Sequence, residues 1–348
     1  MNSNHRVVTI HDVAKRAGVS PTTVSHVQSG NRPVNDTTAQ RVTRAMLELG
    51  YTPNRAARAL ALGTPRVLAL LVPDIANPFF AELAKGAEDA ADSRGFGLLL
   101  GNASFDRARE LHYLDSLPSR AVDGLIYVAG APPDHSYLRR IALRYPIAIV
   151  DEELADVPAL TVMADNYNGG GLVADYLFEL GHRSVLMITG PATLPTSVQR
   201  SAGFLDRINS RPCGLRPTVR TVAGRYDEPS GYEAAERTLR TGSFTPTAIF
   251  ALNDLMAIGA IHALHDMGQS VPGDVSVIGY DDTPLGAAVS PPLTTVHQSP
   301  YGLGSTAAEQ LIQWILSKSR PTVDSIVLGV RLVERASASV PRGGDVER

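Results

Sequence analysis

Some residue types and sequence patterns are rare or missing in this chain of 348 residues, and each absence excludes a class of protein or site. The single cysteine, Cys213, excludes an internal disulfide and any zinc site built from cysteines. No apolar run approaches the roughly 18 residues that a membrane span needs, and no signal-peptide pattern follows the N-terminus. We therefore expect a cytoplasmic protein, and 44% hydrophobic with 19% charged residues is typical of a folded one.

The sequence motifs of common enzyme classes are also missing. The chain has no Gly-x-Gly-x-x-Gly, no phosphate-loop lysine, no Gly-x-Ser-x-Gly and no His-Glu-x-x-His. His262 and His265 lie one helical turn apart, but they lack the companions that a metal site requires. We therefore expect a protein that is not an enzyme, holds no metal and uses no cofactor.

The N-terminal fifty residues carry the strongest local pattern that is present. Thr9 followed by Asp12 has the spacing of a capping box and predicts the start of a first helix. Ser20 is a favourable N-cap and Pro21 suits the first position of a second helix. Apolar residues recur at helical spacing over 36–49, which predicts a third helix. Two short helices around a tight turn indicate a helix-turn-helix.

Charge is divided unequally along the chain. Residues 1–66 hold nine basic and three acidic side chains, a net charge of +6, so the remainder carries −9 of the total of −3. A basic end gains from phosphate contacts and counterion release, whereas an acidic body is repelled by DNA. The second helix of a helix-turn-helix presents its first residues to base edges, here Pro21, Thr22 and His26. The alternative is a three-helix fold with a solvated polar face.

From Arg66 onward, short apolar runs alternate with longer helical patterns. The expected strands are 67–72, 97–100, 124–128, 147–150, 185–188, 248–250 and 275–278, and the helices between them include 80–93, 169–180 and 254–267. This alternation is typical of parallel sheets buried on both faces. The pattern pauses near Asp165 and begins again, which indicates two sheet lobes with a ligand cleft at the carboxyl ends of the strands.

Polar and aromatic side chains gather where these expected strands end. Any one Asp or Asn at such a junction can be an ordinary helix cap, and the pair Phe79-Phe80 can be ordinary core. Their recurrence at the same end of successive strands favours a binding cleft instead.

Four motifs of the N-terminal region resemble the head and hinge of the lactose and galactose repressor (LacI/GalR) family of bacterial transcriptional regulators. They are Asp12-Val-Ala-x-x-Ala-Gly-Val-Ser20, Thr23-Val-Ser-His26, Leu49-Gly-Tyr-x-Pro-Asn54 and Arg58-Ala-Leu60. The resemblance extends along nearly the whole chain. It implies an α/β protein with a three-helix helix-turn-helix head, a hinge helix and a two-lobed body of doubly wound parallel sheets, similar to periplasmic sugar-binding proteins.

The resemblance also implies boundaries. The head is expected at 7–53, the hinge helix at 54–64, the effector-binding and dimerisation body at 65–340 and a tail at 341–348. Within the body, lobe one is expected at about 65–165 and 296–322, and lobe two at about 166–294 and 323–340. The chain should therefore cross between the lobes near 164–168, 293–298 and 320–325.

Site residues carried over from the family fall into two groups. The expected DNA contacts are Thr9, Ser20, Pro21, Thr22, Thr23, Ser25, His26, Asn31, Tyr51, Asn54, Arg55, Arg58 and Leu60. Leu60 is expected to wedge into the minor groove, and its alternative is an exposed linker leucine. The expected effector contacts are Asn77, Phe79, Phe80, Asp151, Arg200, Tyr226, Asn253, Asp281 and Gln298.

These features predict a homodimeric repressor of a carbohydrate-use operon that binds a near-palindromic double-stranded operator and responds to a small sugar-like effector. The purine-sensing branch of the family is an alternative, because it shares Arg200, Asp281 and His26. That branch carries an arginine at the position of Leu194, and some pentose binders carry one at that of Glu152. A solute-binding protein without a regulatory role is the other alternative, and the DNA-binding head argues against it.

Overall fold

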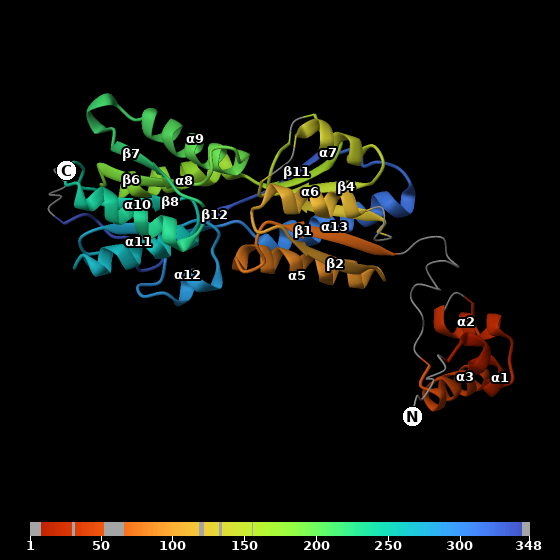
Figure 1. Cartoon of the computed structure of the whole chain (residues 1–348). Coiled ribbons are helices and arrows are strands. Elements are labelled where there is room, and N and C mark those ends of the chain that lie inside the picture. The colour runs from red at the N-terminus through yellow and green to blue at the C-terminus, as the bar shows by residue number, and fades with distance from the viewer. Residues whose placement is uncertain are drawn as a thin grey trace. The chain divides into compact units, whose positions relative to one another are not determined.

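The computed structural model describes residues 8–29, 32–51, 66–117, 122–131, 134–154 and 156–342 (Figure 1). The chain divides into two compact units, Met1–Pro65 and Arg66–Arg348. Among the described residues, no helix combines the length and the apolar character that crossing a bilayer would demand.

The described part of the first unit contains three helices around one small core. They are α1 (Ile10–Ala17), α2 (Pro21–Ser29) and α3 (Asp36–Leu49). Their buried side chains are Val13, Ala14, Ala17, Val24, Val42 and Ala45. The predicted bounds of the third helix are confirmed. Val24 is the fully buried residue of α2 in this core, and the described polar residues of α2 are exposed or half-buried.

The predicted helix ends of this unit are confirmed by their hydrogen bonds. The backbone N–H of Thr9 donates to the Asp12 carboxylate at 2.9 Å, which satisfies one free donor at the start of α1. Gly18 ends the helix in the left-handed conformation, with φ of 65°. The backbone N–H of Thr23 donates to Oγ of Ser20 at 3.1 Å, so Ser20 caps α2 as predicted.

The second unit begins with a six-stranded parallel sheet in the order β11-β5-β4-β3-β1-β2. Its strands are β1 (Val67–Val72), β2 (Gly97–Asn102), β3 (Gly124–Val128), β4 (Ile147–Val150), β5 (Leu160–Ala164) and β11 (Ser325–Leu328). One face is covered by α5 (Pro78–Ser93) and α13 (Pro300–Ser317), and the other by α6 (Arg107–Ser116) and α7 (His135–Ala142). The sheet is doubly wound, as predicted, and we call this part lobe one.

Lobe two of this unit is a four-stranded parallel sheet in the order β7-β6-β8-β9. Its strands are β6 (Ser184–Thr189), β7 (Thr218–Ala223), β8 (Ala248–Ala251) and β9 (Ser276–Ile278). Its helices are α8 (Asn166–Glu179), α9 (Pro195–Asn209), α10 (Glu228–Arg240), α11 (Asp254–Asp266) and the short α12 (Pro284–Ala288), and a 3₁₀ turn, η2, spans Cys213–Leu215. Figure 1 shows α8 and α9 on one side of this sheet and α10 and α11 on the other.

A two-stranded antiparallel pair, β10 (Thr295–His297) with β12 (Arg331–Val333), lies beside the points where the chain changes lobes. Crossings occur between β5 and α8, between β10 and α13, and between β11 and β12. The first two fall where the sequence predicts them. The third does not, because β11 pairs with β5 in lobe one, so residues 323–328 were wrongly expected in lobe two. A four-residue, half-exposed edge strand carries too weak an apolar pattern to predict its sheet.

Close contact between α8 and α9 sets the position of a buried arginine. A Cβ atom at Gly170 would collide with the carbonyl oxygen of Arg200, and one at Gly203 would collide with that of Tyr167. Only glycine lets the two helices approach this far. The pair therefore holds α9, and with it Arg200, at a fixed depth beside the cleft.

Candidate functional site

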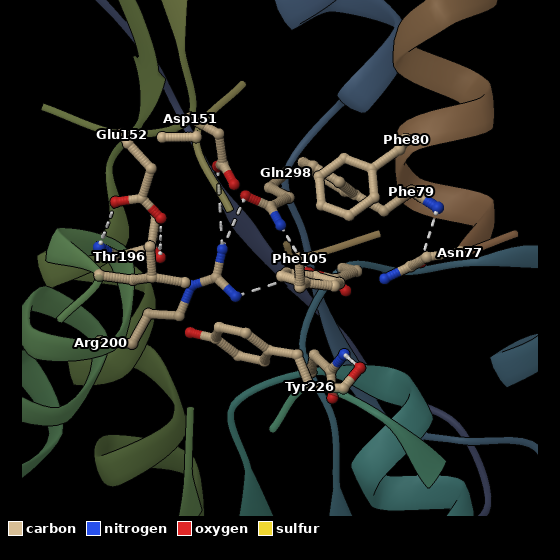
Figure 2. A pocket seen from close by; sticks show the side chains of 14 residues that line it. Asn77, Phe79, Phe80, Phe105, Asp151, Glu152, Thr196, Arg200, Tyr226 and Gln298 are labelled. Carbon is tan, nitrogen blue, oxygen red and sulfur yellow. Dashed lines mark hydrogen bonds and ion pairs between the residues drawn. The ribbon is translucent and has the colours of Figure 1, made fainter. Parts of the chain in front are cut away.

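A cavity of about 400 Å³, open to solvent, lies at the carboxyl ends of the strands of both lobes (Figure 2). Lobe one contributes Asn77, Phe79, Phe80, Phe105, Ala129, Asp151 and Glu152. Lobe two contributes Leu194, Thr196, Arg200, Tyr226, Asn253 and Asp281, and Gln298 follows β10 at a crossing. The mixture of aromatic and polar walls suits a small polar ligand.

All nine residues that the sequence predicts as effector contacts line this one cavity. Five further lining residues are Phe105, Ala129, Glu152, Leu194 and Thr196. Thr196 lies four residues before Arg200 on α9, and this helical spacing could have indicated it. Phe105 follows the β2 strand at its carboxyl end, which is the signal that singled out the other residues.

Arg200 is the central cation of the cavity, and it is only 3% exposed. Its guanidinium donates to the Asn166 side chain at 2.7 Å, to the Leu252 carbonyl at 2.8 Å and to the Gln298 side chain at 3.3 Å. Its carbon Cζ lies 4.0 Å from the centre of the Tyr280 ring, as in a cation–π contact. Each of the three guanidinium nitrogens therefore has a hydrogen-bond partner, which holds the fork of donors rigid beside the cavity.

Two carboxylates flank this arginine from different lobes. Nη1 of Arg200 lies 3.6 Å from Oδ1 of Asp281, and Nη2 lies 4.0 Å from Oδ1 of Asp151. The Gln298 amide also donates to Asp281 at 2.5 Å. Burial raises the pKa of both carboxyl groups, while the Arg200 charge opposes that rise. Figure 2 shows dashed lines from the Arg200 guanidinium to both Asp151 and Gln298.

A third buried carboxylate, that of Glu152, connects the two lobes. The Thr196 hydroxyl donates to Oε1 of Glu152 at 2.6 Å, and the Thr196 backbone N–H donates to Oε2 at 3.0 Å. Glu152 follows β4 of lobe one, whereas Thr196 lies in the first turn of α9 in lobe two. Burial, followed by the nearby Asp151 charge, raises the pKa of Glu152 to about 8. The carboxylate thus caps a helix of the opposite lobe.

Aromatic rings form the apolar wall of the cavity. Phe79 and Phe80 meet edge to face with ring centres 5.2 Å apart, and Phe105 lies 6.4 Å from Phe80. Tyr226 belongs to the lobe opposite these rings, and burial raises its pKa to about 12. Figure 2 shows Phe79 and Phe80 across the cavity from Arg200. A ligand between them would have one apolar and one hydrogen-bonding surface.

Two of the predicted effector contacts also act as helix caps, which was the alternative interpretation of these residues. Asn77 accepts from the Phe79 backbone N–H at 3.0 Å and caps α5, and Asn253 accepts from Met256 at 2.9 Å and caps α11. The Asn253 amide further donates to the Tyr226 carbonyl at 3.0 Å. Capping and lining are therefore compatible at these two positions.

Four lining residues adopt a backbone conformation that side chains disfavour. The φ angles are +53° at Phe105, +69° at Asp151, +64° at Tyr226 and +120° at Asp281. Such strain costs about 1–3 kcal/mol at each position and concentrates at functional sites. It recurs here after four strands whose carboxyl ends face one cavity, which is the pattern expected of a functional site.

Metal chemistry has no support in the described part of the chain. No group of three or more His, Cys, Asp or Glu side chains there is arranged to hold an ion. His262 instead lies 2.8 Å from the Glu228 carboxylate on the surface. The cavity offers hydrogen-bond donors, acceptors and aromatic faces, which are groups that bind a small polar ligand.

Most of the predicted DNA contacts that the structure describes lie on α2 and at its cap. Ser20, Thr22 and Ser25 are exposed, while Pro21, Thr23 and His26 are half-buried. Thr9 is exposed at the start of α1, and Tyr51 packs partly against the small core. Five predicted contacts lie outside the described residues: Asn31, Asn54, Arg55, Arg58 and Leu60. The predicted hinge helix at 54–64 falls outside them too.

Comparisons with known proteins agree with this architecture. The family description "Bacterial regulatory proteins, lacI family" matches residues 9–54, and "Periplasmic binding protein-like domain" matches residues 174–338. The HTH-type transcriptional repressor PurR of Klebsiella pneumoniae subsp. pneumoniae is 36% identical over 335 residues, which cover 96% of this chain and 97% of the relative.

Two solved structures extend the comparison to three dimensions. The lac repressor dimer bound to operator and the anti-inducer ONPF matches with a TM-score of 0.83 and 28% identity, covering 96% of this chain and all of that one. A LacI family transcriptional regulator from Enterococcus faecalis V583 with bound ribose matches with a TM-score of 0.71 and 32% identity, covering 79% of this chain and 99% of that one.

Proposed function

Because this chain belongs to the LacI family of DNA-binding bacterial transcriptional regulators, we propose that it is a repressor whose affinity for its operator is set by a small effector in the cavity between the lobes. The observation that carries this proposal is the convergence of nine predicted effector contacts on one cavity. Four of them, Phe79, Asp151, Arg200 and Asp281, come from separate elements in two lobes.

DNA recognition is assigned to the first unit. The exposed Thr22 and Ser25 and the half-buried His26 lie on α2, behind a capped N-terminus whose dipole favours phosphate. Phosphate contacts fix the position of the helix, and base contacts specify the sequence. The basic residues Arg55 and Arg58 and the wedge Leu60 remain part of this proposal.

The effector is proposed to be sugar-like. Carboxylates, amides and one fixed guanidinium can satisfy vicinal hydroxyl groups, and the rings of Phe79, Phe80 and Tyr226 can cover the apolar face of a sugar ring. The likeness to a ribose-bound regulator supports this class.

A purine effector is the second candidate, since a PurR repressor is 36% identical along nearly the whole chain. The side chain at position 194 argues against it, because the purine-sensing branch has arginine where this cavity has Leu194. A leucine donates no hydrogen bond to a base edge.

Closure of the lobes is the proposed link between effector and DNA. An effector that binds one lobe arrangement more tightly shifts the protein toward it, by no more than its difference in affinity between the two. We propose that effector binding releases the operator. The chain passes between the lobes at three places, and β1, the first strand after the head, belongs to lobe one. A change in the angle between the lobes therefore moves β1 relative to lobe two.

A homodimer is proposed as the DNA-binding form, and the lac repressor relative is a dimer on its operator. Strand β2 is an edge of its sheet, and it exposes Leu99 at 36% and Leu100 at 45%. Exposed leucines on an edge strand favour association with another chain. Two heads would then read two half-sites.

The test is to select, from a random duplex library, the DNA that the full-length protein binds. We expect a near-palindromic site, bound at least a thousandfold more tightly than random DNA at physiological salt. Uniform affinity for all sequences would contradict it. A thermal-shift screen of sugars and purines on the same preparation then identifies the effector class.

A further inference from the structure

The charges of the cavity are unbalanced. Its lining holds three carboxylates, those of Asp151, Glu152 and Asp281, against one cation, Arg200. A fourth carboxylate, Asp254, lies fully buried behind Asp281, and its oxygens accept three hydrogen bonds from Thr283 and Thr295. No lysine, histidine or second arginine lines the described cavity. An ionised, ligand-free cavity therefore has excess negative charge.

Arg200 cannot offset all of this charge. It already faces Asp281 at 3.6 Å and Asp151 at 4.0 Å, so one positive charge is shared between two negative ones. Three of its hydrogen bonds go to neutral groups, and these carry no compensating charge. Glu152 forms no ion pair with it among the described residues.

Among the described residues, Glu152 accepts hydrogen bonds only from neutral donors, and the Arg200 charge acts on it without a direct ion pair. Thr196 supplies a hydroxyl and a backbone N–H, and the α9 N-terminus adds roughly half a positive charge. Beside it, Oδ1 of Asp151 is buried and accepts no hydrogen bond from the described residues. A buried carboxylate oxygen without a donor is costly, and a ligand that donates to it recovers that cost.

We propose that the effector is a hexose-sized amino sugar, with its ammonium group beside Glu152 and Asp151 and its ring between the aromatic wall and Arg200. This inference rests on the proposed function and names the ligand class of the same cavity. An ammonium group supplies three donors and one positive charge, which is what this end of the cavity lacks. A phosphate or carboxylate on the ligand would meet the same negative charge and be repelled.

The remaining walls suit such a ligand. Phe79, Phe80 and Phe105 cover an apolar sugar face, and aromatic rings also attract a nearby cation. Asn77, Asn253 and Gln298 provide neutral partners for the hydroxyl groups.

Proton release provides a second readout. The raised pKa of Glu152 keeps a proton on that carboxyl group near neutral pH, and a bound ammonium group favours its ionised form. Binding of the charged ligand at pH 7 should therefore release protons. Calorimetry in buffers with different ionisation enthalpies measures this release directly.

The experiment is isothermal titration calorimetry on the full-length protein with matched sets of sugars. Each set contains an amino sugar (D-glucosamine, D-galactosamine or D-mannosamine), its parent hexose, its N-acetyl derivative and the hexose 6-phosphate. At least one amino sugar should bind tenfold or more tightly than the three other members of its set. The N-acetyl derivative is the sharpest comparison, because it keeps the nitrogen and removes the charge.

Two variants test whether the preference for the amine depends on the Glu152 carboxylate. Glu152→Gln keeps the shape and removes the charge, so it should lose the preference for the amine and the proton release. Glu153→Gln makes the same chemical change on the adjacent, exposed residue and should retain both. The comparison within the wild-type protein stands even where a variant folds poorly.

Tighter binding of a neutral or phosphorylated member would overturn the amino-sugar inference while leaving a sugar-responsive repressor in place. No binding by any amino sugar would overturn it too. Selection of operator DNA with the same preparation decides the regulatory function separately, so the two failures are distinguishable.

Discussion

The hydroxyl of Thr196 donates a 2.6 Å hydrogen bond to Oε1 of Glu152, so a carboxylate of lobe one caps the first turn of a lobe two helix. Both side chains are buried, with 3% and 2% of their surfaces exposed. Because the two side chains belong to different lobes, a change in the angle between the lobes would alter this contact. It therefore connects the chemistry of the cavity to the conformation that the proposed mechanism requires.

The stability of the ligand-free protein should depend on pH through Glu152. Its pKa is about 8 in the folded protein against 4.5 for the ordinary group. Between these values the folded state keeps a proton that the unfolded state has lost, so raising the pH favours unfolding. The free energy of unfolding should fall across this window by up to about 1.4 kcal/mol per pH unit for this one group.

Urea unfolding followed by the fluorescence of the single tryptophan, Trp314 on α13, measures this dependence. Asp151, Asp254 and Asp281 also have raised pKa values and add slope of the same sign. The prediction therefore concerns the difference between the wild type and Glu152→Gln. The free energy of unfolding should depend less on pH in the variant. Equal profiles would show that Glu152 ionises normally in the folded state.

Asp281→Ala should abolish the response to effector and leave operator binding intact. The substitution removes a carboxylate that faces Arg200 at 3.6 Å, whereas the head is a separate compact unit. A ligand at a hundred times its dissociation constant should stabilise the wild type by about 2.7 kcal/mol, and the variant should gain almost nothing. Thermal shift measures the first effect and DNA anisotropy the second.

The control for that experiment is Asp266→Ala, which removes a carboxylate outside the cavity that accepts from the Tyr232 hydroxyl. It should respond to ligand as the wild type does. A normal response by the Asp281 variant would remove this residue from the effector site.

His26→Ala should alter base preference within each half-site. His26 is half-buried on α2, in the part of the second helix that enters the major groove in such heads. A side chain that reads a base edge discriminates by about 1–3 kcal/mol. Binding to a set of single-base operator variants measures the change, and a uniform loss across the set would instead make His26 a phosphate contact.

Leu100→Arg should convert dimers into monomers. The side chain is exposed on the edge strand β2, and a charge there opposes burial against a second chain. Sedimentation at micromolar concentration measures the oligomeric state, and operator affinity should fall at least tenfold because one head reads only one half-site. Leu215→Arg, at an exposed leucine of lobe two, is the matched control. A Leu100 variant that stays dimeric would exclude β2 from the interface.

Much of the fold follows from short-range sequence patterns. The strands Val67–Val72, Gly124–Val128 and Ile147–Val150 have their predicted bounds because each is a continuous apolar run, buried on both faces. The strand Thr218–Ala223 has no such run, since it alternates polar residues at a sheet edge. The edge strand Ser325–Leu328 likewise lacks a long apolar run and was not predicted. The third crossing between the lobes was therefore predicted a few residues too early.

The site was predictable to the extent that its residues follow strand ends. Asp151, Asn253 and Asp281 come one, two and three residues after the ends of β4, β8 and β9. The position of Arg200 inside the cavity depends instead on the glycine contacts between α8 and α9. The contact between Glu152 and Thr196 could not be predicted, because 44 residues and a change of lobe separate them.

The most direct test of the account measures operator affinity of the full-length protein, by fluorescence anisotropy of the selected duplex, with and without the ligand found by thermal shift. Saturating ligand should weaken operator binding by the wild type at least fivefold, and operator binding by Asp281→Ala should not change with ligand. Operator affinity that is unaltered while the cavity is demonstrably occupied would contradict it.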